Sequence, residues 1–252
     1  MVAVPSSPSC ERAGVLPAGV PPLDGMAGSW LPMKDVANPP DVNNFHDMLL
    51  VNRDLTSFFC NPEDWLWAGG DEQFHFGYPP VTLTVAGGEY PATECRWYPY
   101  CALRRNTNCA GLVVQTDTRM INEQRAVLVR IQIANPATTQ TNVELTLSVS
   151  GSLQADGISV LNPSQRPGFV TVICPATKPD AVTNDNGIIH WRWNVSLPAG
   201  GRKEIEFVAG QMTVMKPGRW LVLSTDIPSA CKLPETDSVS STFVWVMAGL
   251  AI

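Results

Sequence analysis

Apolar and polar residues alternate one by one along much of the chain, a pattern typical of strands with one side buried against a core. Trp191, Trp193 and Val195 fall on one side of such a stretch, and the polar residues between them fall on the other. Residues 126–134 and 143–149 repeat the alternation. A shift of the strand pairing by one residue would point the apolar side chains of each strand toward water, so the pattern specifies the strand register strongly.

Stretches of this kind recur with Gly, Pro and Asn turns between them, and hardly any helical pattern interrupts them. One hairpin turn is predicted at Gly87-Gly88, and a polar connection opens at the Asn-Pro pair of residues 135–136. The count is eleven or twelve strands. The sequence therefore predicts an all-β protein, a large antiparallel β-sandwich of the supersandwich kind with few or no helices.

The two ends of the chain differ from this middle part. Residues 1–42 are rich in Pro, Ser and Gly and are interpreted as a flexible lead, with a single β-sandwich domain over residues 43–252. The last segment, "STFVWVMAGLAI", is apolar and has no polar tail. We interpret it as a strand of a domain truncated at its C-terminus, and as a surface through which copies of the chain could associate.

Composition narrows the classes of partner. The chain has 252 residues, 16% of them charged, with a formal net charge of −6. This balance argues against nucleic acid or an anionic membrane as the main partner. No apolar segment reaches the ~18 residues of a membrane helix, and the N-terminus lacks the basic and apolar regions of a signal peptide. The compartment is left open, with the cytoplasm favoured.

The cysteines and histidines do not form a recognisable metal motif. The seven Cys residues are loosely spaced without a C-x-x-C pair, and the three His residues are scattered. Buried thiols explain them best, and neither a metal site nor a cofactor is predicted. The chain also lacks the glycine-rich, HExxH and GxSxG motifs of nucleotide enzymes, zinc proteases and serine hydrolases.

Two segments together resemble a known family. "LVVQTDTRMINEQRAVLVRIQIANPATTQTNVELTLSVSG" and "WRWNVSLPAGGRKEIEFVAG" are similar to the N-terminal β-sandwich domain of glycoside hydrolases that have an (α/α)6 catalytic barrel. The features are a strand pair joined by an Asn-Pro loop and a late strand ending in Leu-Pro-Ala-Gly. The resemblance implies a supersandwich beside a helical barrel that supplies the acid and base. No catalytic residue is carried over, because this chain contains no such barrel.

The best candidate binding segment is the aromatic and acidic stretch "NPEDWLWAGGDEQFHFGYPP". Sugars stack their C–H faces on aromatic rings, and their hydroxyl groups hydrogen-bond to carboxylates and amides. The alternative interpretation is a loop held by its own aromatic side chains. The candidate carbohydrate-binding residues are Trp65, Trp67, Tyr78, Glu63, Asp64, Asp71, Glu72 and Gln73.

A second candidate is the stretch "ECRWYPYCALRR", where Trp, Tyr and Arg are the residue types that anchor interfaces. Its candidate interface residues are Arg96, Trp97, Tyr98 and Tyr100. The alternative is an edge strand of stacked aromatics followed by an exposed basic pair, Arg104 and Arg105.

A third segment, "QTDTRMINEQR", offers Asp117 and Glu123 as an acid/base pair. Charges of both signs around a turn explain these residues more simply, as a structural salt-bridge patch.

The favoured function is a non-catalytic, carbohydrate-associated domain that shapes a substrate cleft or mediates assembly with a catalytic barrel. The partner would be a carbohydrate or a glycosidase catalytic domain. Two alternatives stay open: a structural, assembly or adhesion protein without sugar affinity, and a free-standing enzyme that uses carboxylates of the 61–80 loop.

Overall fold

The computed structural model describes residues 30–36, 41–43, 48–59, 81–98, 100–121, 126–163, 169–216 and 219–221. Within these ranges the chain forms strands apart from turns, connections and one short 3₁₀-helix, η1 (Met33–Asp35). All strand pairs are antiparallel, in sheets of ten, five and three strands. The predicted all-β antiparallel sandwich is confirmed.

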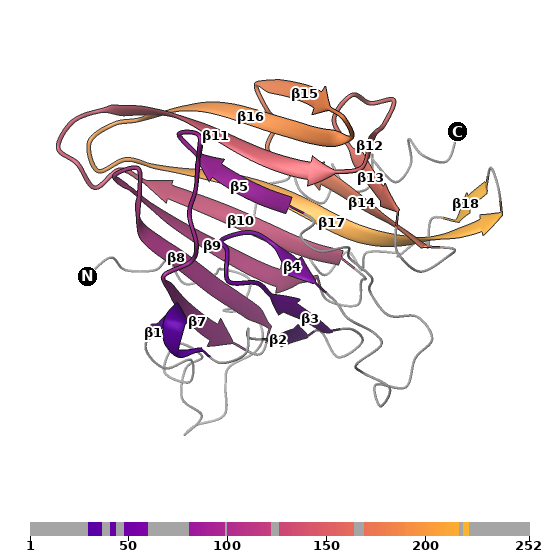
Figure 1. Ribbon diagram of the computed structural model, residues 1–252, viewed down its shortest axis with the longest axis horizontal. Helices are drawn as coiled ribbons and strands as arrows, with labels where there is room; N and C mark the ends of the chain where they lie inside the picture. The colour runs from indigo at the N-terminus through magenta and orange to yellow at the C-terminus, as the bar shows by residue number, and fades with distance from the viewer. Residues whose placement is uncertain are drawn as a thin grey trace, which may run out of the picture.

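The ten-stranded sheet forms the back layer of Figure 1. Strand β18 (Arg219–Leu221) pairs with β17 outside the main path. The path itself runs through β1 (Leu31–Pro32), β7 (Glu94–Tyr98), β8 (Cys101–Cys109), β9 (Leu112–Met120), β10 (Ala126–Ala134), β17 (Arg202–Lys216), β14 (Phe169–Pro175), β13 (Val160–Pro163) and β12 (Ser152–Leu153).

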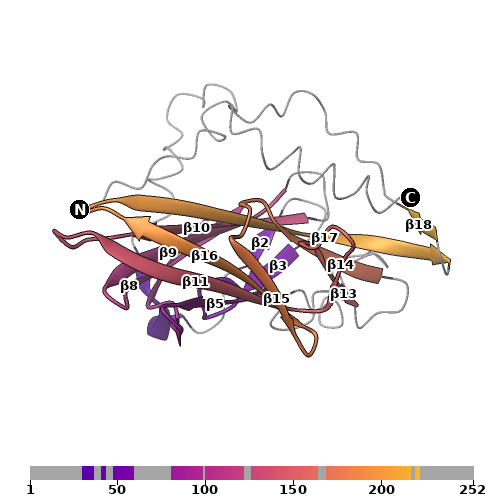
Figure 2. The ribbon, with the colours of Figure 1, turned by 90° about the horizontal axis from the view of Figure 1, so that it is seen from above.

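Two smaller sheets cover the inner face of this large sheet. The five-stranded sheet lies over β10 and β17, and the view from above shows the two layers edge-on (Figure 2). Its order is β15 (Ala181–Asp185), β16 (Ile188–Leu197), β11 (Thr141–Ser150), β5 (Val81–Val85) and β6 (Gly88–Glu89). The three-stranded sheet contacts β8 and β9 and consists of β2 (Asp41–Asn43), β3 (Met48–Val51) and β4 (Phe58–Phe59).

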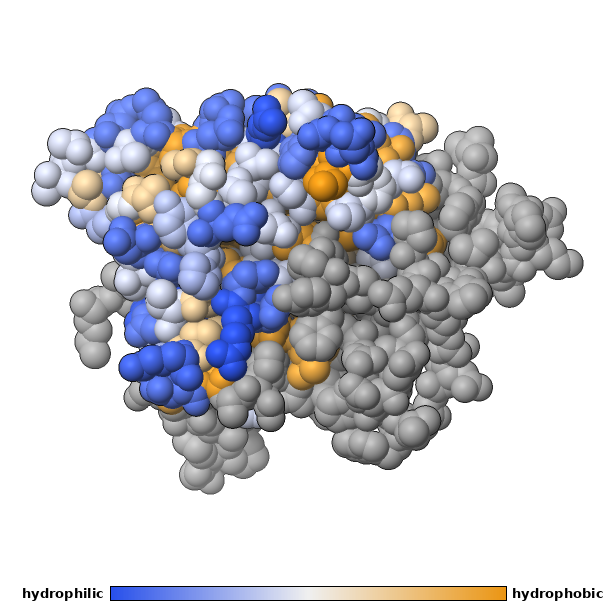
Figure 3. Space-filling view, viewed as in Figure 1, coloured by the Kyte–Doolittle hydropathy of each residue, from blue (hydrophilic) through white to orange (hydrophobic). Residues whose placement is uncertain are grey.

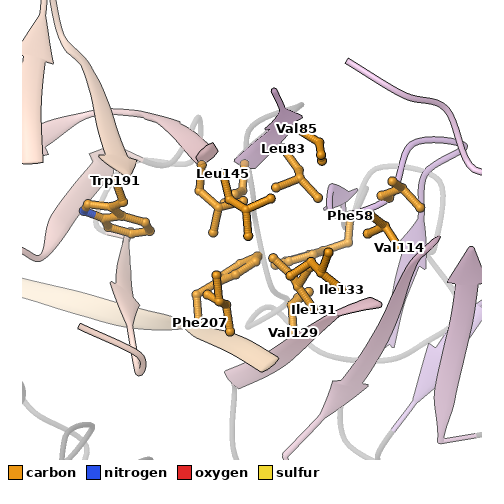
Figure 4. Packing of buried hydrophobic residues seen from close by; sticks show 14 of the residues in the cluster. Phe58, Leu83, Val85, Val114, Val129, Ile131, Ile133, Leu145, Trp191 and Phe207 are labelled. Carbon is orange, nitrogen blue, oxygen red and sulfur yellow. The ribbon is translucent and has the colours of Figure 1, made fainter. Parts of the chain in front are cut away.

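The core lies where the apolar sides of the three sheets meet. Phe58 from the small sheet, Phe207 and Ile131 from the large sheet, and Leu145 and Trp191 from the five-stranded sheet belong to one buried cluster (Figure 4). Every second residue of β9 and of β16 is buried, as alternation predicts. One continuous core therefore holds all three sheets together.

The two tryptophans of β16 enter the core with their polar ends satisfied. Trp191 Nε1 donates to the carbonyl of Ile158 at 2.9 Å, and Trp193 Nε1 donates to the carbonyl of Lys178 at 2.9 Å. A buried indole N–H needs such a partner, because an unpaired donor in the core is costly.

Two-residue turns join three of the hairpins, at Ala86-Gly87, Ala110-Gly111 and Asn186-Gly187, with positive φ at both residues. These are the dihedral signs of type I′ turns, whose twist suits antiparallel strands. The turn predicted at Gly87-Gly88 is therefore wrong by one residue, because Gly88 already pairs with Val85 as part of β6.

Asn135 joins the two sequence features on which the family resemblance rests. Its backbone N–H donates to Gly201, and its side-chain amide lies within hydrogen-bonding distance of the carbonyls of Thr139, Leu197 and Pro198. The Asn-Pro loop and the Leu-Pro-Ala-Gly turn, about sixty residues apart in sequence, thus meet at one end of the sandwich.

The described residues form eighteen strands, more than the predicted eleven or twelve. Six of them have only two or three residues, too few to show alternation in the sequence. β1, η1 and the start of β2 fall within residues 1–42, which were interpreted as a lead. The C-terminal segment "STFVWVMAGLAI" lies outside the described residues. Among the described residues, no helix is long and apolar enough to cross a membrane.

Candidate functional site

The sequence-predicted carbohydrate loop is not among the described residues. All eight of its candidate residues, from Glu63 to Tyr78, fall within residues 60–80. Their assignment as a sugar-binding loop stays a prediction.

The predicted interface residues are split by strand alternation. Arg96 and Tyr98 lie on the outer face of the large sheet, where the Arg96 guanidinium is 5.3 Å from the centre of the Tyr98 ring. The ring centre of Tyr100 is 5.7 Å from that of Tyr98. Trp97 lies on the opposite face of β7 and is 42% exposed. The structure therefore brings three of the four residues together, and their role as an interface stays a prediction.

Trp30 extends this aromatic group along the outer face. The guanidinium of Arg105 lies 4.0 Å from the centre of the Trp30 ring, and its Nε donates to Glu94 at 2.6 Å. A cation placed over an aromatic ring and paired with a carboxylate is a stable surface contact. Here it fixes the position of Trp30 against β8.

Arginines neutralise the carboxylates in the middle of the same face. Asp117 is paired with Arg119, and Arg130 bonds Glu206 at 2.6 Å and approaches Glu204 at 3.9 Å. Glu123, the second half of the suggested acid/base pair, lies outside the described residues. The ion pair of Asp117 with Arg119 agrees with the interpretation of this segment as a structural salt-bridge patch.

Arg104 departs from its interpretation as half of an exposed basic pair. Its side chain is fully buried on the inner face, and it donates to the carbonyls of Asn52, Asp54 and Ser57 and to the hydroxyl of Thr118. Burial lowers the pKa of Arg104 to about 10, although Asp54 acts in the opposite direction. Strand alternation is the reason, because Arg105 points outward and its neighbour must point inward.

The described cysteines are structural. Cys95, Cys109 and Cys174 are buried, and burial raises the pKa of both Cys109 and Cys174 to about 12. Thiols with such pKa values hold their protons and are poor nucleophiles and metal ligands. The described part of the chain contains no group of three His, Cys, Asp or Glu residues that could hold a metal ion.

The outer face of the five-stranded sheet carries side-chain hydroxyls in register. We call this surface the hydroxyl face and define it by the outward residues of β5, β6, β11, β15 and β16. In the space-filling view, the region over β11 and β16 is mostly hydrophilic to intermediate in hydropathy (Figure 3). Its central residues, which surround the buried Thr146, are Thr82, Thr84, Ser148, Thr183, His190 and Arg192.

The register arranges these residues in two rows across the strands. The first row is Thr82, Ser148, His190 and Thr183, each opposite the next on the neighbouring strand. The second row lies two residues further along the strands. It consists of Glu89, Thr84, Thr146, Arg192 and Ala181.

A hydrogen bond fixes the centre of the first row. The Ser148 Oγ lies 2.8 Å from His190 Nδ1, and both side chains are half-buried between their neighbours. Further along the same face, the amide of Gln140 donates to the Ser196 hydroxyl at 2.9 Å. These groups can donate and accept hydrogen bonds toward the solvent side, which is the chemistry that a hydroxyl-rich ligand needs.

The sequence contained a signal for this face. The polar members of "VTLTV" and "VELTLSVS" are Thr and Ser at alternate positions, but alternation was used only to find the buried side. Which strands lie side by side decides whether their hydroxyls form rows, and that pairing is not visible in the sequence.

Comparisons with known proteins leave the chain without an assigned family. No family model matches it, and no curated protein matches it. Among solved structures, a protein named as a kojibiose phosphorylase from the human microbiome is similar at 11% identity and a TM-score of 0.32. A polysaccharide lyase is similar at 12% identity and a TM-score of 0.29.

Both likenesses are partial. They cover 68% and 71% of this chain, which in turn spans only 29% and 33% of the two proteins. Both named proteins are carbohydrate-active enzymes, and at these TM-scores the function of this chain has to be argued from its own residues.

Proposed function

We propose that this chain is a non-catalytic, carbohydrate-associated β-sandwich domain of a glycoside-hydrolase-like protein. It would contact carbohydrate through the hydroxyl face and work beside a catalytic barrel. The observation that carries the proposal is the two rows of outward hydroxyl, imidazole and guanidinium groups on the five-stranded sheet. Sugars display the complementary set of donors and acceptors along their edges.

The pairing of carboxylates on the large sheet supports the non-catalytic part. Glycoside hydrolysis needs two carboxyl groups placed on either side of a bond, one of them able to give up a proton. Asp117, Glu206 and Glu94 are each bonded to an arginine instead. Each of these three carboxylates is engaged in an ion pair, so none of them is a free member of such a catalytic pair.

Calorimetric titration of the purified chain with α- and β-linked oligosaccharides tests the proposal, with product analysis on the same samples. The expected result is saturable binding without products. The double variant Thr82→Val/Thr84→Val keeps the β-branched shape and removes two hydroxyls, so affinity should fall about ten-fold. Thr139→Val is the matched control, because Thr139 is exposed in the loop between β10 and β11, away from the rows.

The other outcomes separate the alternative functions. Products formed by the purified chain would support the enzyme that uses carboxylates of the 61–80 loop. Self-association in sedimentation experiments, with no response to any sugar, would support a structural or assembly protein. Equal affinity of the double variant and the parent would contradict the hydroxyl face as the binding surface.

A further inference from the structure

Resting on the proposed function, we infer that the hydroxyl face binds an extended, neutral polysaccharide chain that lies across the strands, with about one sugar unit per strand. The ligand is a polymer segment of at least four sugar units. A single sugar or a disaccharide does not fill the site.

The geometry of the first row sets the direction in which the polysaccharide lies on the sheet. Thr82, Ser148, His190 and Thr183 come from four neighbouring strands. Neighbouring strands are ~4.8 Å apart, so the row is about 14 Å long. The strand spacing is close to the length of one sugar unit in an extended chain. A chain laid across the strands therefore meets an equivalent polar group at each unit.

The second row provides a second line of contacts parallel to the first. It lies two residues further along each strand, about 7 Å away. Its centre consists of Thr84 and Arg192 on either side of the buried Thr146, and Glu89 ends it on β6. The two rows can therefore contact the two edges of one flat chain.

The chemistry of the hydroxyl face explains why the ligand must be several sugar units long. Among the described outward residues of the five-stranded sheet there is no Trp, Tyr or Phe, the His190 imidazole is bonded to Ser148, and the large apolar residue there is Ile188, which is 42% exposed. Without a ring to stack on, a single sugar gains only hydrogen bonds that replace those it makes with water, and each has a small net value. Several such bonds in register are needed to offset the loss of freedom on binding.

The side chains of the first row have little rotamer freedom to lose on binding. Threonine is branched at Cβ and has few χ1 rotamers, and Ser148 is bonded to His190 at 2.8 Å. Little side-chain freedom is therefore lost when the polymer binds. This makes a contact based on hydrogen bonds alone feasible.

The charges on the hydroxyl face favour a neutral polysaccharide over an acidic one. The outward side chains of this sheet include Glu89, Glu144 and Asp185, against Arg192 as the permanent cation. This excess of negative charge repels an acidic polysaccharide and leaves a neutral one unaffected. Binding of the neutral polymer should also change little with salt, because it does not depend on ion pairs.

The test is a length series. Neutral β-linked gluco-oligosaccharides of two to six units, and oligogalacturonates of the same lengths, are titrated into the purified chain by calorimetry at low and high salt. We expect affinity for the neutral series to rise at least ten-fold from two to five units, with little change in salt. The acidic series should bind more weakly at every length.

Variants and NMR spectra show where the polysaccharide binds on the protein. Ser148→Ala and Thr183→Val should each weaken binding of the six-unit sugar about three- to ten-fold, and Thr139→Val should leave it unchanged. Amide NMR shifts with the six-unit sugar should follow the first row across β5, β11, β16 and β15. Thermal unfolding of each variant confirms that it is folded before its affinity is compared.

The outcomes distinguish this inference from the proposed function. If no sugar of either series binds the folded chain, both are overturned. If the two-unit and six-unit sugars bind equally well, if the acidic series binds more tightly, or if the shifts follow one strand alone, the inference is overturned and the proposed function stands. A length-dependent, salt-independent response that weakens in Ser148→Ala and not in Thr139→Val supports the inference.

Discussion

At the scale of the residue, Asn135 is the clearest test of how the sandwich end is held. We expect Asn135→Ala to destabilise the protein by about 2–3 kcal/mol, because the two N–H groups of its amide donate among three nearby carbonyls and its Oδ1 accepts from the Ala137 backbone N–H. Urea unfolding followed by fluorescence measures the change. Asn142→Ala is the control, since Asn142 is exposed, and its effect should stay within about 0.5 kcal/mol. Equal effects of the two would contradict this role of Asn135.

The environment of Asp156 leads us to expect that the free energy of unfolding depends on pH. Burial acts to raise the pKa of Asp156, but hydrogen bonds from the Ser159 hydroxyl and from the backbone N–H groups of Ile158 and Ser159 lower it below its ordinary value of 3.8. The ionised carboxylate therefore stabilises the fold above that value, and this stabilisation is lost as the pH falls through the lowered pKa.

The measurement is urea unfolding of the parent and Asp156→Asn between pH 7 and pH 2. The variant keeps an oxygen for the two backbone donors and loses the charge, so it should be about 1 kcal/mol less stable at pH 7. The difference should shrink below pH 4. Asp185→Asn is the control on an exposed hairpin, and the same pH dependence there would argue against a specific role of Asp156.

Alternation in the sequence identified the inward and outward residues, but not what they contact. It correctly placed Trp191, Trp193 and Ile131 inside. It did not show that Arg104 is buried, because a basic residue is usually exposed and only the loop at residues 52–57 provides the carbonyls that hold it. Contacts between residues about fifty positions apart depend on the fold and not on local pattern.

At the scale of the element, the turn at Gly151 is the most constrained of the described glycine positions. Its φ is +146°, and a Cβ built there would lie 2.4 Å from the carbonyl oxygen of Leu161. We expect Gly151→Ala to cost about 3 kcal/mol, from backbone strain and from the clash between the end of β11 and β13. Thermal unfolding measures the loss.

Gly111→Ala is the matched control for this prediction. Gly111 has a φ of +82° in the β8–β9 hairpin, and a Cβ there meets no atom within 4 Å. Gly111→Ala should lower the free energy of unfolding only through the strain of a positive φ, by about 1 kcal/mol. If both variants lose the same stability, the clash with Leu161 has no effect.

The strands could be predicted from the sequence, but the candidate site that they form together could not. The long strands β10, β11 and β16 were predictable, since each carries four or five alternating apolar residues. The hydroxyl face was not, because β5, β11 and the β15–β16 hairpin are neighbours in space but are separated in sequence. Sequence reasoning favoured aromatic loops as binding sites, whereas a row of small polar side chains appears only once the register is known.

At the scale of the whole molecule, the shared core predicts one cooperative unfolding transition. Phe58 comes from the three-stranded sheet, yet it belongs to the same buried cluster as Phe207 and Trp191 (Figure 4). Phe58→Ala should therefore cost about 3–5 kcal/mol and lower the midpoint for the entire sandwich, not for β2–β4 alone.

Two probes distinguish this outcome from local loosening. Tryptophan fluorescence includes the signal of Trp191 in the five-stranded sheet, and amide exchange of Leu49 and Val51 reports on β3. Both should show the same loss of stability in Phe58→Ala, because neither face of the core can stay packed when the other opens. If amide protection of β3 falls while the fluorescence midpoint is unchanged, the three-stranded sheet is an independent unit and the single-core prediction is wrong.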